Sequence, residues 1–151
     1  MPRAFKSSKY GYEDGDKVAK SWVKDITEDQ TVNLGEAIDH LVFLCHTVSV
    51  AGGWWHNEGE PIERNVGEQI CLMHSELSEG MEGERKDLVD DHLPEFDSIT
   101  VELADAMTRI FDYAGGRGIN LGAALIAKLK YNQQREDHKI ANRIKAGGKS
   151  F

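Results

Sequence analysis

Two pairs of acidic residues stand out because the members of each pair lie three positions apart. The first pair is Glu76 and Glu79, and the second is Glu102 and Asp105. In an α-helix, residues three apart share a face, with their Cβ atoms roughly 5–6 Å from each other. Four carboxylates brought together repel and raise one another's pKa unless a cation lies between them. Because carboxylate oxygens suit hard cations such as Mg²⁺ and Mn²⁺, the spacing predicts a metal site built on two helices.

Acidic residues on an exposed helix face are usually solvated surface and nothing more, which is the plainest alternative to a metal site. A di-iron bundle needs Glu-x-x-His on two helices, and no histidine of this chain follows an acidic residue at that spacing. The clustered His and Cys ligands of a zinc site are also absent from the sequence. Cys45 and Cys71 fall in apolar runs, and we expect them to be free, buried thiols.

The acidic pairs need helices to hold them, and apolar residues recur at helical spacing in four stretches. We expect the first helix to start at Asn33 and end at Gly52, and the second to run from Asn65 to about Lys86. The third should be capped by Ser98 or Thr100 and the fourth by Asn120. The expected apolar stripes are Leu34, Ile38, Leu41, Cys45 and Val48; Ile70, Met73, Leu77 and Met81; Leu103, Met107, Ile110 and Phe111; and Leu121, Leu125 and Leu129.

The third helix divides into two faces, and its polar face carries Glu102, Asp105, Arg109, Asp112 and Tyr113. No stretch has the alternation of a β-strand. We therefore expect an all-α protein, a four-helix bundle with short connections. Its apolar surface is large for four helices, so we expect dimerisation to complete the bundle.

The chain of 151 residues suggests one domain, at 33–138, with a polar N-terminal extension at 1–32 and a basic tail at 139–151. Its net charge of −8 argues against binding to nucleic acid polymers or to an anionic membrane. The N-terminus lacks an apolar signal segment, and the longest apolar run, Leu41–Ala51, is too short to span a bilayer. These features favour a cytoplasmic protein.

Trp54 and Trp55 are adjacent in a stretch with the composition of a loop. Two neighbouring indoles are costly to leave exposed, so either they fold back onto the core or one of them is a platform for an aromatic ligand. His56 could contact the same ligand or have only a structural role.

The order and spacing of the acidic pairs resemble a known family. Glu76-x-x-Glu79, a gap of 22 residues (80 to 101) and then Glu102-x-x-Asp105 is similar to the signature of the all-α nucleoside triphosphate pyrophosphohydrolases of the MazG type. The later element Lys128-x-x-x-Asn132-x-x-Arg135 resembles the downstream part of that family's pattern. The resemblance covers about residues 33–138. One departure is Ser75, since the family often has an acidic residue directly before the first glutamate.

This resemblance implies Mg²⁺-dependent hydrolysis of nucleoside or deoxynucleoside triphosphates to the monophosphate and pyrophosphate, with Mn²⁺ as another suitable ion. It implies a metal shell made of Glu76, Glu79, Glu102 and Asp105. Either Glu76 or Glu79 would instead orient or deprotonate the attacking water.

The resemblance also implies the substrate contacts. Lys128, Asn132 and Arg109 would hold phosphate oxygens, and Trp54 or Trp55, with His56, would bind the base. The partners would be the nucleotide and further copies of the chain, in a homodimer or homotetramer. Two alternatives stay open: a nucleotide-binding or sensing protein of this fold without catalysis, and a purely structural helical partner. The preferred base and sugar are not specified by the sequence.

Overall fold

The computed structural model describes residues 28–138 and residue 142. Within them lie four α-helices, two short strands and one 3₁₀ turn: α2 (Glu28–Ala51), β1 (His56–Asn57), β2 (Glu60–Pro61), α3 (Val66–Lys86), α4 (Ser98–Gly116), α5 (Leu121–Gln134) and η1 (Glu136–His138). The described part of the chain is therefore mostly helical, and the predicted all-α class is confirmed. The expected extension up to residue 27 and most of the basic tail lie outside the described residues.

Contacts between Cα atoms divide the chain into two units. One unit is Gly35–Leu125, which holds most of α2, the two strands, α3 and α4. The other combines Met1–Leu34 with Ile126–Phe151, and its described part includes the second half of α5. Both acidic pairs belong to the first unit, whereas Lys128 and Asn132 belong to the second.

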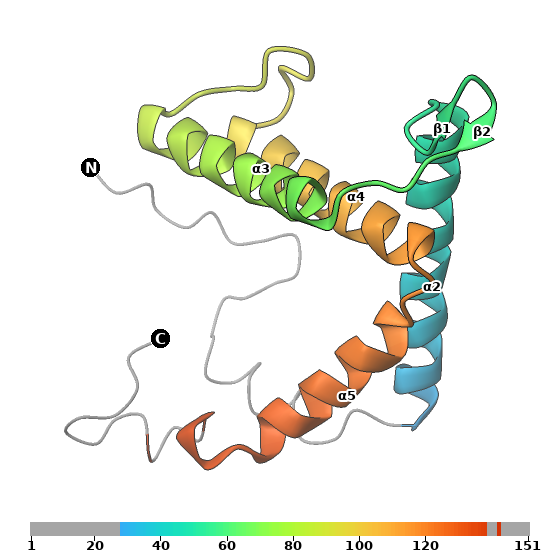
Figure 1. The fold of residues 1–151 in the computed structure, drawn as a ribbon. Coiled ribbons are helices and arrows are strands. Elements are labelled where there is room, and N and C mark those ends of the chain that lie inside the picture. Colours follow the sequence, from blue (N-terminus) through green and yellow to red (C-terminus); the bar gives the residue numbers. More distant parts are fainter. Residues whose placement is uncertain (1–27, 139–141, 143–151) are drawn as a thin grey trace. The chain divides into compact units, whose positions relative to one another are not determined.

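Helices α3 and α4 lie side by side and antiparallel, and they carry the two acidic pairs (Figure 1). Their close approach depends on Gly80, where an added Cβ would lie 2.8 Å from the Cδ1 atom of Ile99 and 3.2 Å from the Cβ atom of Glu102. A side chain at this position would push α4 away from α3. The glycine therefore sets how close Glu102 comes to the first acidic pair.

The two helix ends that frame this hairpin have different caps. The side chain of Asn65 accepts a hydrogen bond from the backbone N–H of Glu68, as the sequence predicts. At the start of α4, however, Asp97 is the N-cap residue and makes no side-chain capping bond. The expected cap at Ser98 or Thr100 is wrong, because both residues already lie inside the helix.

The connection between α3 and α4 is ordered by its own contacts. The carboxylate of Asp90 accepts hydrogen bonds from the backbone N–H groups of His92 and Leu93, at 2.9 and 2.7 Å. Val89 and Asp97 form an isolated antiparallel bridge. These contacts bring the two ends of the connection together, so the helices on either side run back along each other.

The predicted start of the first helix at Asn33 is wrong, because α2 already contains residues 28–33. A capping pattern can occur inside a helix where no glycine or proline interrupts the preceding turn. The predicted end is confirmed, since the helix stops at Ala51 before two glycines. The cap at Asn120 is confirmed too, because its side-chain oxygen accepts from the backbone N–H of Ala123 at 3.1 Å.

The expected loop after Trp55 contains a small β-hairpin, so the prediction of no strand is wrong for these few residues. His56 pairs with Pro61 and Asn57 pairs with Glu60. The two turn residues, Glu58 and Gly59, both have positive φ angles, of 52° and 87°. Such a turn matches the twist of paired strands, although polar residues hide it from a search for alternating apolar positions.

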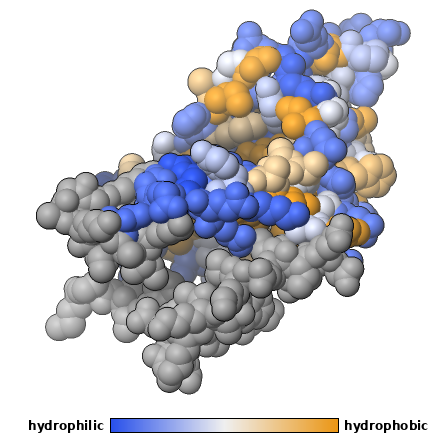
Figure 2. Space-filling model, turned by 90° about the horizontal axis from the view of Figure 1, so that it is seen from below, coloured by the Kyte–Doolittle hydropathy of each residue, from blue (hydrophilic) through white to orange (hydrophobic). Residues whose placement is uncertain are grey.

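The apolar stripes differ most from expectation. In α2 the stripe is buried at Ile38 but largely exposed at Val48, which is 71% accessible. Leu77 and Met81 of α3 and Leu103 and Met107 of α4 are each at least 47% exposed. Figure 2 shows apolar side chains at the surface of the described residues. The sustained buried stripe expected for α2 is therefore wrong, and the apolar faces of α3 and α4 are open in this single chain.

The two cysteines are free thiols, as expected, but their predicted burial is wrong. Cys71 is exposed on α3 and Cys45 is only partly buried in α2. The reason is the same as for the apolar stripes, because residues in an apolar run are buried only where another element covers them.

One helical stretch, Thr31–Ala51, is long and apolar enough to cross a membrane by length and composition. It is longer than the apolar run Leu41–Ala51 that was expected from the sequence. Core helices of soluble proteins and signal sequences can have the same length and composition, so these two properties do not tell which of the three roles the stretch has.

Candidate functional site

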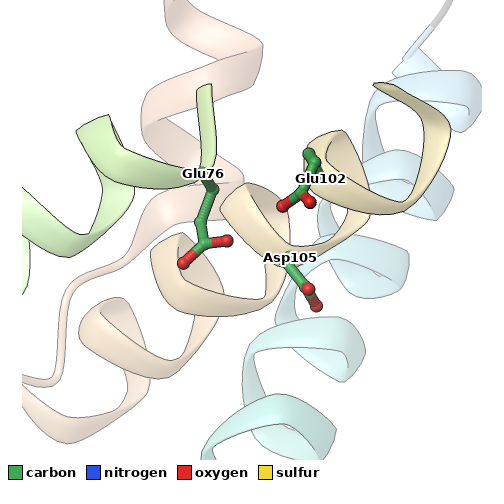
Figure 3. A group of neighbouring side chains, drawn as sticks. All are labelled: Glu76, Glu102 and Asp105. Carbon is green, nitrogen blue, oxygen red and sulfur yellow. The ribbon is translucent and has the colours of Figure 1, made fainter. Parts of the chain in front are cut away.

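Three of the predicted metal ligands come together between α3 and α4. Glu76 projects from α3, and Glu102 and Asp105 project from α4 (Figure 3). Each contributes a carboxylate oxygen, and these oxygens lie within 4.8 Å of one another. Glu76 is only 5% exposed, and Asp105 is exposed. The group is therefore buried on one side and open to solvent on the other.

The electrostatics of the group show how crowded the negative charge is. The pKa of Glu102 is raised to about 6, first by burial, then by a hydrogen bond with Glu76, and then by the charges of Glu79, Glu76 and Asp105. Each of these effects disfavours the ionised form of Glu102. A cation bound among the carboxylates would favour the ionised form and so oppose these effects.

Glu79, the fourth predicted ligand, is exposed on α3. Its charge acts on Glu102, but it is not one of the three residues whose oxygens approach within 4.8 Å. Its role as a ligand or a base stays a prediction.

The guanidinium of Arg109 supplies positive charge at the buried end of the group. Its Nε atom donates to Oε1 of Glu76 at 2.5 Å. The Glu76 side chain is 7% exposed and that of Arg109 is 42% exposed, so the pair bridges the interior and the surface. A metal ion that used this oxygen of Glu76 would have to compete with Arg109.

The donor set fits a hard divalent cation. Its atoms are all carboxylate oxygens, and one side is open, which leaves room for water and for oxygen ligands of a substrate. Mg²⁺ usually takes only one or two carboxylates and completes its shell with water and phosphate oxygens. The arrangement can therefore hold a metal, although it does not by itself select Mg²⁺ over Mn²⁺.

A pocket of about 390 Å³ adjoins the acidic group. Matching faces of two helices form its walls, because the lining residues follow one another at i, i+3, i+4 and i+7 in both. They are Cys45, Val48, Ser49 and Gly52 in and after α2, and Asp105, Thr108, Arg109 and Asp112 in α4; Trp54 and Arg64 complete the lining. Asp105 and Arg109 thus belong to both the pocket and the acidic site.

At the far end of the pocket, Asp112 is 8% exposed and holds three parts of the chain together. Its Oδ1 atom accepts from the indole N–H of Trp55 at 2.8 Å and lies 2.9 Å from Nδ1 of His46. The rings of His46 and Trp55 meet edge to face, with their centroids 5.1 Å apart. The ring of Trp55 lies where a side chain at Gly116 would be, so the glycine permits this contact.

The three residues predicted to bind a base take different positions. Trp54 is 64% exposed and lines the pocket beside the acidic site. Trp55 is held by Asp112, and both Trp55 and His56 line a separate pocket of about 320 Å³. Trp55 thus packs against the rest of the chain, as one of the two alternatives expected, whereas the ring of Trp54 is accessible and its role as a platform for a ligand stays a prediction.

The predicted phosphate ligands also divide into two groups. Arg109 lines the pocket, whereas Lys128 and Asn132 lie on the part of α5 that belongs to the other unit. There the ammonium of Lys128 lies 5.1 Å from the centre of the Tyr131 ring. The roles of Lys128 and Asn132 in phosphate binding stay predictions.

Asp112 was expected on the polar face of its helix, but the sequence assigned it no role. His46 and Arg64 were overlooked, because their importance depends on contacts across 66 and 48 positions of the chain. The available signal was the polar stripe of α4, which continues from Asp105 to Asp112 at helical spacing. A stripe of this kind on an otherwise apolar helix indicates a polar interior surface.

The raised pKa of Glu102 predicts an effect on stability. The folded pKa of about 6 exceeds the ordinary value of 4.5, so between these pH values the folded state binds more protons than the unfolded state. In metal-free protein, the contribution of Glu102 to the free energy of unfolding should fall as pH rises through this range. Thermal unfolding of wild type and Glu102→Gln over this range tests it; parallel pH profiles would contradict it.

The pairing of Arg109 with Glu76 predicts competition with metal. In Arg109→Gln, the affinity for Mn²⁺ without nucleotide should rise roughly fivefold or more, because no guanidinium competes for the carboxylate. The metal-free variant should lose about 1–3 kcal/mol of stability, since a buried acceptor is left without its partner. Calorimetric titration with Mn²⁺ measures the first effect. Arg85→Gln, on the exposed side of α3, is the control, and an unchanged affinity in Arg109→Gln would refute the competition.

Comparisons with known proteins supply no relative for this site: no protein-family model, no curated protein and no solved structure matches the chain. The resemblance to the MazG type therefore stays a prediction. The positions of Glu76, Glu102 and Asp105, and the pocket beside them, are what a functional proposal can rest on.

Proposed function

We propose that the chain is a metal-dependent nucleoside triphosphate pyrophosphohydrolase, which converts a nucleoside or deoxynucleoside triphosphate and water to the monophosphate and pyrophosphate. The observation that carries the proposal is the convergence of Glu76, Glu102 and Asp105 beside a pocket that also contains an exposed tryptophan. The pocket offers a carboxylate from the metal site, Asp105, and an aromatic surface, Trp54. A nucleotide has a matching division into phosphates and base.

The proposed cofactor is Mg²⁺, with Mn²⁺ as an alternative. When bound, it would neutralise charge on the phosphates and make water a better nucleophile. The carboxylates of Glu76, Glu102 and Asp105 would hold it. Glu79 is exposed and close enough for its charge to act on Glu102, which suits it to accept a proton from the attacking water.

Arg109 has a place in this chemistry because it lines the pocket as well as contacting Glu76. With a metal held by Glu76, the guanidinium of Arg109 would be free to bind a phosphate oxygen. Attack of water on the α-phosphorus breaks the bond to the bridging oxygen, so pyrophosphate leaves and the nucleoside keeps one phosphate.

A nucleotide sensor without catalysis is the second candidate, and one contact favours it. Arg109 already neutralises part of the acidic group without a metal, through its 2.5 Å contact with Glu76. In a sensor, this arginine would replace the metal and bind nucleotide phosphate directly. The sensor would then bind nucleotide in EDTA, whereas the enzyme requires the metal.

We further propose that two copies of the chain complete a helical bundle. The support is the open apolar surface of α3 and α4, where Leu77, Met81, Leu103 and Met107 are each at least 47% exposed. Stable interfaces bury about 800 Å² on each partner, and rows of large apolar side chains are suited to their centres.

Phosphorus NMR with Mg²⁺ and a panel of triphosphates tests the activity. Pyrophosphate with monophosphate is expected, and Asp105→Asn should lower the rate on the order of 10²–10³-fold, the scale of losing one electrostatic contact to the transition state. Glu84→Gln, an exposed acid on α3 outside the site, is the matched control. Orthophosphate with diphosphate, or an unchanged rate in Asp105→Asn, would overturn the proposal.

The oligomer is tested by sedimentation equilibrium. Wild type should sediment as a dimer or a larger assembly, and Met81→Glu should weaken self-association tenfold or more, since a charge would be buried at the interface (~1.4 kcal/mol or above). Val89→Glu changes a similarly exposed apolar residue in the connection, away from the stripe, and should have little effect. A wild-type protein that stays monomeric at every concentration refutes the dimer.

A further inference from the structure

We propose that Arg64 determines base specificity, so that the pocket prefers bases with a ring carbonyl (guanine, hypoxanthine, thymine, uracil) over bases with an amino group in its place (adenine, cytosine). This inference rests on the proposed function for the identity of the ligand as a nucleotide. The residues that carry it lie at the end of the pocket away from the metal ligands.

The pocket is long enough to separate phosphate from base. Asp105 and Asp112 lie seven residues apart on the same face of α4 and both line the pocket. At 1.5 Å per residue, the two positions are about 10 Å apart along the helix. Phosphates at the Asp105 end therefore leave room for a pentose before the base reaches Asp112 and Arg64.

Arg64 has hydrogen-bond donors to spare. Its side chain is 18% exposed, and its closest charged contact, Nη1 to Oδ2 of Asp112, is 3.9 Å, too long for a hydrogen bond. Within residues 28–138, the structure gives the guanidinium no hydrogen-bond acceptor. A guanidinium carries five N–H donors and no acceptor, so a partly buried one that lines a pocket is suited to a ligand with acceptor atoms.

Two aromatic rings lie next to the guanidinium of Arg64. Its guanidinium carbon lies 5.9 Å from the centre of the Trp54 ring and 5.7 Å from that of Trp55. The guanidinium lies over the Trp54 ring, so a base that binds next to this exposed ring would be within reach of Arg64. Stacking alone is tolerant of base identity, so the discrimination must come from the polar group at the edge.

Asp112 keeps the arginine at this position. Its Oδ1 atom is already engaged by Trp55 and His46, and its Oδ2 atom faces Arg64. The backbone oxygen of Arg64 also accepts a hydrogen bond from Arg117 at 2.8 Å. Asp112 is thus a positioning residue, and the N–H groups of Arg64 are the ones left for a ligand.

The chemistry of the bases then decides the preference. Guanine and thymine present a carbonyl oxygen at the position where adenine and cytosine present an amino group. A guanidinium can donate to the carbonyl oxygen but not to the amino group, so it favours the bases with the carbonyl. A good pairing of this kind discriminates by roughly five- to a hundredfold.

The test uses two matched pairs of nucleosides, inosine against adenosine and uridine against cytidine, in EDTA. Neither metal nor phosphate is present, so the result does not depend on catalysis. Binding is read from the rate at which N-ethylmaleimide labels Cys45, which lines the pocket, with exposed Cys71 of α3 as the internal reference. Burial raises the pKa of the Cys45 thiol, so labelling is done at mildly alkaline pH.

We expect inosine and uridine to protect Cys45 at concentrations about tenfold lower than adenosine and cytidine, without protecting Cys71. Arg64→Gln should abolish this difference, and Arg64→Lys, which keeps the charge but loses the planar donors, should reduce it. Arg85→Gln should leave it unchanged. Circular dichroism confirms that each variant is folded.

Two results overturn the inference: equal protection by both members of each pair, or a preference that survives in Arg64→Gln. Absence of any protection also overturns it, because the base subsite is then missing. These outcomes are separable from the proposed function. Pyrophosphate production without base preference would refute only the base subsite at Arg64. Base-selective protection without turnover of any triphosphate would refute only the proposed enzymatic activity.

Discussion

The burial of a carboxylate between α3 and α4 is the constraint on which the site depends. Glu76 is 5% exposed and lies among other acids, an arrangement that costs free energy unless positive charge is supplied. Arg109 supplies part of this positive charge, and the pKa of Glu102 is raised. The balance of charge in this group therefore depends on Arg109 and on any cation that binds there.

The same helix, α4, has a polar face that lines the pocket and an apolar face that is exposed. Asp105, Arg109 and Asp112 follow one face of α4 and line the pocket, while Leu103 and Met107 on the other face are exposed. In an ordinary amphipathic helix the apolar face would be covered. The polar face along the pocket and the exposed apolar face are both accounted for if the pocket takes a charged ligand and the apolar face is covered by another chain.

Much of the local structure could be predicted from the sequence, because short-range rules decide it. The caps at Asn65 and Asn120 were found from single residues, and the i, i+3 spacing found the carboxylates that meet. The start of α2 failed because a capping pattern says nothing about the turn before it. Arg64 and His46 were missed for a different reason: both contact Asp112, and contacts over 48 or 66 positions leave no local pattern.

The α3–α4 hairpin explains why the number of residues between the two acidic pairs matters. The connection at 87–97 is closed by its own bridge between Val89 and Asp97, so residues could be added within it without turning either helix. An insertion inside α3 or α4, between an acidic pair and the connection, would keep each pair intact but slide it past the other pair and rotate it by about 100° per residue about its helix axis. An insertion within a pair would rotate one carboxylate by about 100° and separate its members. The number of helical residues between each acidic pair and the connection thus sets how far from the connection the carboxylates lie. Chains that share this site should therefore differ in the length of the connection and not in the length of these helical segments.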